Sequence, residues 1–300
     1  MEKNIKYNIG SEFVLLAAAI IWGFAFVAQK AGMDSIGPMA FNGIRFLLGA
    51  VTLLPLLYFT KSEPKGGKSV GSLWVAGLLS GTVLFFAAST QQFGIVFTTA
   101  GNAGFITSLY VIIVPVFGIF LNHKINSQTW VGALLALGGL YFLSVKENFT
   151  ISFGDLLVLG SAFVWALQVL LAGYYSVKFN VVKLAAIQFT LTGVLSLVIS
   201  FFTETYTWQN INNALIPLLY GGIMSVAVAF TLQLYGQKKA KPSHAAIILS
   251  TESVFAAFGG WLILSENLTS REITGAALML CGVMLSQIRF GVNSKRNHQR

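Results

Sequence analysis

Runs of about twenty apolar residues recur along almost the whole chain, and this repetition constrains the fold more than any other feature of the sequence. The hydrocarbon core of a bilayer is about 30 Å thick, so a helix needs roughly 20 apolar residues to cross it. Short polar segments separate the runs, as expected for loops between membrane-spanning helices. The pattern therefore predicts a polytopic membrane protein.

Ten transmembrane helices are predicted from these runs. They are Glu12–Ala31, Pro38–Thr60, Leu73–Phe97, Ala100–Leu121, Thr129–Val145, Asp155–Tyr175, Val181–Thr203, Leu215–Gln237, His244–Leu264 and Glu272–Phe290. A β-barrel does not fit, because its strands alternate apolar and polar residues whereas these runs are apolar on every face. Pro55 and Pro115 lie within two of the spans and are expected to kink them. The fold class predicted is an all-α polytopic membrane protein, in agreement with a mean hydropathy of +0.74.

The distribution of lysine and arginine predicts the orientation of the chain. A net charge of +9 could indicate a nucleic-acid partner, but the basic residues lie mainly in alternate loops. With both termini in the cytoplasm, fifteen of them lie on the inner side and three, Lys30, Lys146 and Arg271, on the outer side. The basic charge therefore indicates membrane topology and no nucleic acid, and Arg45 is the one cation within a span.

The two halves of the chain resemble each other. A shift of about 142 positions aligns Phe93–Gly118 with Tyr235–Gly260, since both segments join an aromatic–glycine pair to a polar turn and a new apolar run. A shift of 143 with a small gap pairs Gly132 with Gly275, Gly139 with Gly282, Trp22 with Trp165, Arg45 with Gln188 and Phe46 with Phe189. The sequence therefore predicts two repeats, residues 1–147 and 148–300.

Each predicted repeat holds five spans, so the second copy must enter the membrane in the opposite orientation. Inverted repeats of this kind are typical of transporters that work by alternating access, with the substrate site near the bilayer midplane between the copies. The alternative is a duplication that produced a helical bundle without transport. The repeat favours transport, because inverted repeats occur mostly in carriers and channels.

Four segments of the sequence carry a resemblance to a known family. They are "AIIWGFAFVAQKAG", "AFNGIRFLLGAVTLLPLL", "TTAGNAGFITSLYVIIVPVFG" and "LSTESVFAAFGGWLILSENLTSREITGAALMLCGVMLS". On these, the chain resembles the EamA-domain family of the drug/metabolite transporter superfamily over Ser11–Phe290. The resemblance implies a transporter of small metabolites in a bacterial inner membrane, with a central cavity lined largely by the third, fourth, eighth and ninth spans. It does not fix the substrate, because the family carries many kinds of solute.

Two ionisable residues, Arg45 and Glu252, lie well inside predicted spans. A charge at the centre of a bilayer costs about 2.5–3.5 kcal/mol, so each residue needs a partner or an aqueous cavity. Arg45 is suited to bind a substrate carboxylate or, alternatively, to brace backbone carbonyls near the outer end of the bundle. Glu252 is suited to bind a substrate amine or a coupling proton. A direct or water-bridged pair of the two residues is a further option.

Polar and aromatic residues of the spans supply the other candidates for a substrate-binding site. They are Trp22, Gln91, Asn102, Tyr110, Trp165, Gln168, Gln188, Gln233 and Ser250. Tyr110 aligns with Glu252 in the repeat, so these two residues are expected to face one cavity from opposite halves. We expect about half of the polar candidates to line the path, because hydrogen bonds between helices account for many such residues in any bundle.

Other functional classes find little support in the sequence. A membrane-embedded enzyme is one alternative, but the three histidines lie at loops or a span edge and show no catalytic or metal-binding spacing. A passive channel is another alternative. It would favour rings of like charge or repeated carbonyl filters, and neither is visible in the sequence. We therefore predict a secondary transporter, most simply an exporter, of small metabolites such as amino acids. Its expected partners are the lipid bilayer, the solute and protons or another coupling ion, with no cofactor.

Overall fold

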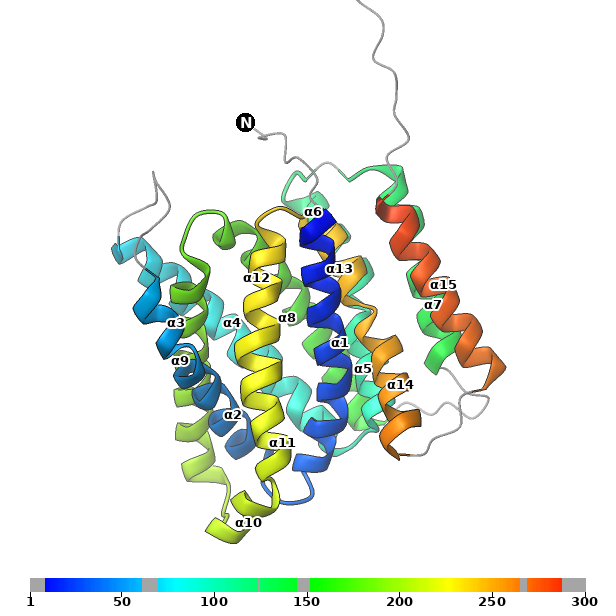
Figure 1. Ribbon diagram of the computed structural model, residues 1–300. Coiled ribbons are helices and arrows are strands. Elements are labelled where there is room, and N and C mark those ends of the chain that lie inside the picture. Colours follow the sequence, from blue (N-terminus) through cyan, green and yellow to red (C-terminus); the bar gives the residue numbers. More distant parts are fainter. Residues whose placement is uncertain (1–8, 61–69, 124, 145–151, 265–268, 288–300) are drawn as a thin grey trace, which may run out of the picture.

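The computed structural model is built from helices (Figure 1), and it describes residues 9–60, 70–123, 125–144, 152–264 and 269–287. In chain order the elements are α1 (Ile9–Gly32), α2 (Pro38–Thr52), α3 (Leu54–Phe59), α4 (Val70–Val96), α5 (Ala100–Ser108), α6 (Tyr110–Phe120), α7 (Ser127–Ser144), α8 (Phe153–Ser176), α9 (Val181–Thr203), α10 (Trp208–Asn213), α11 (Leu215–Leu219), η1 (Tyr220–Phe230), α12 (Thr231–Gln237), α13 (Pro242–Leu249), α14 (Glu252–Leu264) and α15 (Ser270–Gln287). No strand occurs in these ranges, so the predicted all-α class is confirmed for them.

Eight helical segments of the described chain are long and apolar enough to cross a membrane. They are Gly10–Gly32, Pro38–Phe59, Ser72–Val96, Ala100–Phe120, Phe153–Ser176, Val181–Thr203, Leu215–Gln237 and Pro242–Ile263. The other two predicted spans are helical as α7 and α15, but their described apolar stretches are shorter. In α15 this is because the helix begins with the polar residues Ser270, Arg271 and Glu272.

Several spans are interrupted rather than continuous. The second span breaks at Leu53, which separates α2 from α3, and Pro55 stands in the first turn of α3 as predicted for a kink. Pro115 lies inside α6, whereas the fourth span breaks earlier, at Leu109 between α5 and α6. The ninth span breaks at Ser250 and Thr251, between α13 and α14, without a proline.

Glycines allow close approach of helices at two interfaces. In the contact of α2 with α9, a Cβ on Gly43 would lie 2.5 Å from Leu197 Cδ2. Between α7 and α15, the backbone of Gly139 meets Gly275, and that of Gly132 meets Gly282. Small residues are common where membrane helices pack closely, because their backbones can then approach each other. The pair α7 and α15 lies at one edge of the bundle (Figure 1).

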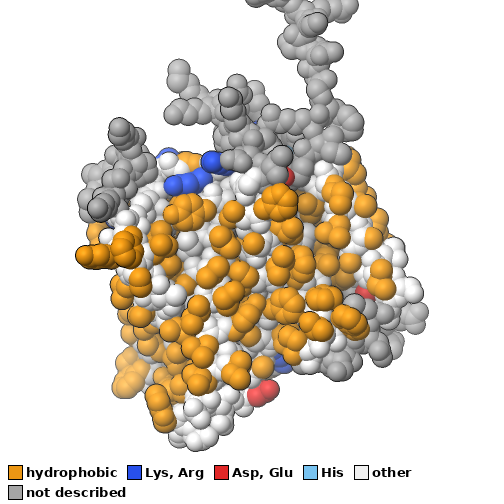
Figure 2. Space-filling model, in the orientation of Figure 1, with side chains coloured by type: hydrophobic (Ala, Val, Ile, Leu, Met, Phe, Trp, Pro, Cys, Tyr) orange, Lys and Arg blue, Asp and Glu red, His pale blue; other side chains and the backbone are white. Residues whose placement is uncertain are grey.

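The outer surface agrees with a bilayer environment. Figure 2 shows hydrophobic side chains over most of the visible face, while the coloured charged side chains lie near the margins of that face. Large apolar residues are widely exposed, including Phe201 and Phe202 at 79% each. A continuous apolar surface of this extent marks contact with lipid or protein. The beginning of α1 and the end of α15 lie at the same end of the molecule (Figure 1).

Candidate functional site

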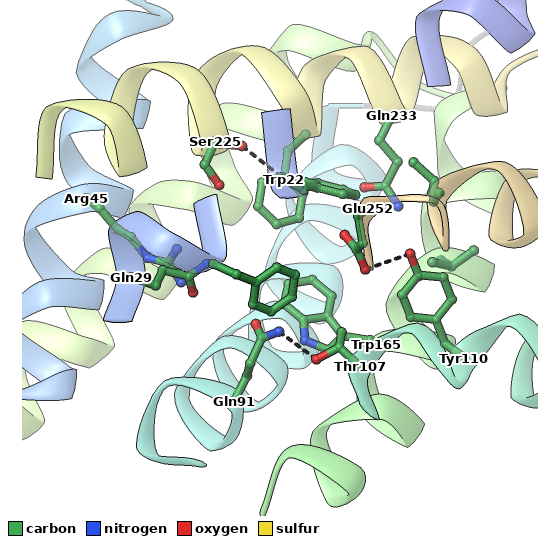
Figure 3. A pocket seen from close by; sticks show the side chains of 14 residues that line it. Trp22, Gln29, Arg45, Gln91, Thr107, Tyr110, Trp165, Ser225, Gln233 and Glu252 are labelled. Atoms are coloured by element: carbon green, nitrogen blue, oxygen red, sulfur yellow. Dashed lines mark hydrogen bonds between the residues drawn. The ribbon is translucent and has the colours of Figure 1, made fainter. Parts of the chain in front are cut away.

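A partly open cavity lies inside the bundle, and the empty space in and around it amounts to about 480 Å³. Figure 3 shows it from close by, and its lining comprises Trp22, Phe26, Gln29, Arg45, Gln91, Thr107, Tyr110, Trp165, Val169, Ser225, Phe230, Gln233, Leu249 and Glu252. Its lining of apolar walls with a few polar groups is typical of small-molecule sites. The first, second and sixth spans contribute side chains besides the four spans that the resemblance implies.

Two broken helices meet at this cavity. The break between α5 and α6 lies at Leu109, and the break between α13 and α14 lies at Ser250 and Thr251. Ser108 Oγ donates a hydrogen bond of 3.3 Å to the carbonyl oxygen of Ser250 across the two breaks. Non-helical backbone at membrane depth is tolerated where protein covers it or where it lines a cavity, and binding sites of transporters often use it.

Tyr110 and Glu252 stand immediately after these breaks, at the first positions of α6 and α14. The Tyr110 hydroxyl donates a hydrogen bond of 3.0 Å to Oε1 of Glu252, and both side chains are at most 4% exposed (Figure 3). Both line the cavity, as the repeat alignment predicts for aligned positions of opposite halves. The cavity thus holds a buried carboxyl group that accepts a hydrogen bond from Tyr110.

Arg45 enters the cavity from α2 and is 3% exposed. Its Nε donates a hydrogen bond of 2.9 Å to Asn42 Oδ1 on the same helix. Asn42 in turn donates from Nδ2 to the carbonyl oxygen of Ala88 on α4, at 3.1 Å. Asn42, and not Arg45, therefore makes the link between α2 and a neighbouring backbone carbonyl.

No carboxylate of the described chain lies within 4.0 Å of the Arg45 guanidinium, so the direct pair of Arg45 with Glu252 is not formed. The two residues lie at different sides of the cavity (Figure 3). Arg45 instead packs against aromatic faces, with Cζ 5.5 Å from the ring centroid of Phe41 and 5.0 Å from that of Phe46. Cation–π contacts offset part of the cost of burying the charge.

Aromatic side chains form a wall between Arg45 and Glu252. Trp22 meets Phe230 edge to face at 4.7 Å between ring centroids, and Trp165 stacks on Phe230 at 5.8 Å with an interplanar angle of 20°. Phe46 lies 6.1 Å from the same ring. Phe230 therefore joins the surroundings of Arg45 to both tryptophans, and the two predicted tryptophans face the cavity from opposite halves of the chain.

The π-helix η1 holds part of this wall in place. Trp22 Nε1 donates a hydrogen bond of 3.1 Å to the carbonyl oxygen of Ser225, and the Tyr220 hydroxyl donates one of 2.9 Å to the carbonyl oxygen of Ile21. Both bonds join α1 to η1. Wide helical turns are frequent at functional sites, because they release and re-aim backbone groups.

Four of the predicted candidates do not line the cavity. Gln168 is buried and accepts a 3.2 Å hydrogen bond from Nε2 of Gln233, a residue that does line the cavity. Gln188, the repeat partner of Arg45, is buried against Gly81 of α4.

Ser250 and Asn102 are the other two. The Ser250 hydroxyl donates back to the carbonyl oxygen of Ile247 in its own helix, at 2.8 Å. Asn102 lies in the first turn of α5, where its backbone N–H donates to the capping hydroxyl of Thr99. The Ser250 contact fits a structural role, of the kind that many polar residues have in helical bundles, whereas the Asn102 contact is made by its backbone.

Sequence reasoning missed several lining residues, of which Gln29 is the most informative. Gln29 is 5% exposed, and its Nε2 donates to the carbonyl oxygen of Ala25 at 3.2 Å. A signal for it exists, because Trp22, Phe26 and Gln29 follow the spacing of residues on one face of a helix. Thr107, which accepts a 2.8 Å bond from Gln91 Nε2, has no comparable signal.

The fold and the cavity together define a multi-pass helical membrane protein with a partly polar internal site. The chain belongs to the EamA-like transporter family, whose model matches residues 10–145 and 152–287. Family membership shows a membrane transporter, as the sequence predicts, and points to transport rather than catalysis.

Named relatives agree with this assignment. An uncharacterized transporter of Archaeoglobus fulgidus is 34% identical over 276 residues, which cover 92% of this chain and 85% of that protein. The uncharacterized transporter YoaV of Bacillus subtilis is 29% identical over 287 residues, covering 92% of this chain and 96% of YoaV. A solved crystal structure matches with a TM-score of 0.78 and 16% identity, covering 92% of this chain and 98% of the other, so it shares the fold.

Proposed function

We propose that this protein is a secondary transporter that exports small amphipathic metabolites, such as amino acids, by alternating access. The observation that carries the proposal is the hydrogen bond from Tyr110 to Glu252, inside a cavity where two broken helices cross. A buried carboxylate at such a crossing can bind and release a proton as water reaches it from one side and then the other. Substrate and proton would share the cavity.

The proposal includes two inverted repeats, residues 1–147 and 148–300, with ten transmembrane helices. A two-fold axis between repeats exchanges equivalent positions, so equivalent residues touch each other only near the axis. Tyr110 with Glu252 is such a pair, and Phe46 lies 6.2 Å from Phe189, its partner in the alignment. These contacts support a pseudo-two-fold axis through the cavity.

The pair of helices α7 and α15 supports the same axis. Gly132 is equivalent to Gly275 and Gly139 to Gly282, and the contacts run crosswise, from Gly132 to Gly282 and from Gly139 to Gly275. A two-fold rotation turns one of these contacts into the other. This arrangement is the one expected when the last helix of each repeat packs on its counterpart.

We further propose a bacterial inner-membrane location with both termini in the cytoplasm. The support is the excess of lysine and arginine in the loops of that side, together with the position of α1 and α15 in Figure 1. Lys178 and Lys238, in the turns before α9 and α13, would then face the anionic inner leaflet.

Transport by purified protein in liposomes tests the proposal. With an imposed proton gradient and no ATP, we expect movement of at least one zwitterionic amino acid, and we expect it to stop when an ionophore collapses the gradient. Inside-out and right-side-out populations, separated by a protease-accessible tag, give the direction. A detectable chemical product without movement of any solute would contradict the proposal in favour of a membrane enzyme, and conduction without saturation would favour a channel.

A further inference from the structure

Arg45 carries a buried positive charge that the described chain does not neutralise. Its side chain is 3% exposed, and only Nε has a hydrogen-bond partner, the amide oxygen of Asn42. Because no carboxylate of the described chain lies within 4.0 Å, the terminal nitrogens of the guanidinium remain available in the cavity. An unpaired buried charge is costly, so the site favours an anion from outside the chain.

Asn42 also fixes the direction of the guanidinium. Its amide donates to Ala88 and accepts from Arg45, so the oxygen that holds Nε is itself held by α4. A guanidinium held at Nε presents its two terminal nitrogens together, and this geometry matches the two oxygens of a carboxylate. The alternative role for Arg45, bracing backbone carbonyls, is not what its contacts show.

A second donor in the cavity lacks a partner. Trp165 Nε1 is buried and has no acceptor within hydrogen-bond distance, while its ring stacks on Phe230 with an interplanar angle of 20°. Both residues line the cavity, and a stacked aromatic pair in its wall favours a planar apolar group, since offset stacking adds to the burial of apolar area. Gln29 Oε1 is a buried acceptor without a donor, on the same side of the cavity as Arg45 (Figure 3).

We propose that the cavity binds amphipathic carboxylates, with the carboxylate on the Arg45 guanidinium and a planar apolar group against Trp165 and Phe230. An ammonium beside the carboxylate would donate to Gln29 Oε1, so aromatic amino acids fall within this class. The inference rests on the proposed transport function, because it names the solute class of the same cavity. Glu252 lies apart from the position proposed for the solute carboxylate, so its own carboxyl group remains available to bind the coupling proton.

Four probes that differ by one group each test this assignment on the full-length protein in detergent. Phenylalanine has the carboxylate, the amine and the ring; 3-phenylpropionate lacks the amine, phenethylamine lacks the carboxylate, and alanine lacks the ring. Isothermal titration calorimetry gives the Kd of each. We expect phenylalanine and 3-phenylpropionate to bind at least about tenfold more tightly than phenethylamine and alanine. Equal binding of phenylalanine and phenethylamine, or no binding of either acid, would overturn the proposal.

Two arginine variants supply a matched comparison. Arg45→Gln removes the charge in the cavity, whereas Arg271→Gln removes one from α15, where the guanidinium lies 5.5 Å from the ring of Tyr141 and 5.7 Å from that of Phe142. Both arginines therefore contact two aromatic rings, but only Arg45 lines the cavity. We expect about a tenfold or greater loss of phenylalanine affinity for Arg45→Gln and less than about a twofold change for Arg271→Gln.

The design separates this proposal from the transport function. Binding is measured without a membrane gradient, so a protein that binds both acids but moves no solute keeps the carboxylate site and loses the transport proposal. A protein that transports amines but has no affinity for either acid would keep the transport proposal and lose the carboxylate site. If Arg45→Gln does not fold, the probe series on the unaltered protein still tests the proposal. In that series, phenethylamine removes the carboxylate from the ligand instead of the positive charge from the protein. Retention of full phenylalanine affinity by a folded Arg45→Gln protein would remove Arg45 from the site.

Discussion

The Tyr110 hydroxyl donates a 3.0 Å hydrogen bond to the Glu252 carboxylate, and 142 positions, the repeat shift itself, separate the two residues. The same separation joins Ser108 to Ser250, whose hydrogen bond crosses the two helix breaks. Equivalent positions thus meet at the centre of the bundle but carry different side chains. A phenol stands in one half where a carboxylate stands in the other, so the arrangement is asymmetric in chemistry.

Replacing Glu252 by glutamine tests whether its carboxylate couples transport to protons. The amide keeps an oxygen that can accept from Tyr110, so we expect the protein to fold, while its transport loses its dependence on pH because the amide cannot bind a proton in this range. The measurement is the initial rate of solute movement in liposomes across a range of pH. Glu12→Gln, in the first turn of α1 and outside the cavity, serves as the control. A pH profile that is the same in Glu252→Gln and the unaltered protein would exclude the coupling role.

Replacing Tyr110 by phenylalanine removes only the hydroxyl that donates to Glu252. A buried polar group that loses its hydrogen-bond partner costs about 1–3 kcal/mol, so we expect lower thermal stability and a displaced pH profile of transport. The double variant with Glu252→Leu, which removes the acceptor, should lose less than the sum of the two single changes, because the residues are in contact. Additive effects in thermal denaturation would show that the bond contributes nothing.

The glycine contacts of α7 and α15 predict a sharp difference between neighbouring positions. A Cβ on Gly139 would lie 2.5 Å from the carbonyl oxygen of Gly275, whereas one on Gly138 would meet nothing within 4 Å. Overpacking typically costs about 1–3 kcal/mol, so Gly139→Ala should lower the melting temperature in detergent. Gly138→Ala should leave it unchanged or raise it slightly, since alanine favours helix. Similar melting temperatures for the two variants would argue against this interface.

Glu204 forms a contact between the halves that the sequence did not indicate. Its carboxylate accepts from the backbone N–H groups of Met39 and Ala40, at 2.8 and 2.7 Å, at the beginning of α2. An anion there satisfies free donors and interacts favourably with the helix dipole. Glu204→Gln should therefore destabilise the protein by about 0.5–2 kcal/mol, measured by thermal denaturation. Glu12→Gln is again a suitable control, and equal stability of the two variants would deny the capping role.

Much of the fold was predictable, because its signals are local. The apolar runs predicted the helical class and the positions of the long apolar spans, and Pro55 predicted the break beside Leu53. The break at Leu109 was not predicted, and Pro115, which is expected to kink the fourth span, lies inside α6. The count of ten spans rested on length and hydropathy alone, and eight segments of the described chain meet that criterion.

The candidate site was predictable only in part. Arg45 and Glu252 stood out because charge is rare in an apolar run, and both line the cavity. Gln168 and Gln188 looked equally suitable in the sequence, yet both are buried outside the cavity, because the rotation of each helix decides which face its polar residues occupy.

The sequence by itself determined a helical membrane protein of two similar halves, because hydropathy and the length needed to cross a bilayer act within each segment. Tertiary structure alone decided that Asn42 takes up the link to α4 and leaves Arg45 without a counter-ion, and that Tyr110 meets Glu252. These contacts join residues far apart in the chain through helix packing and helix breaks, so no local pattern records them.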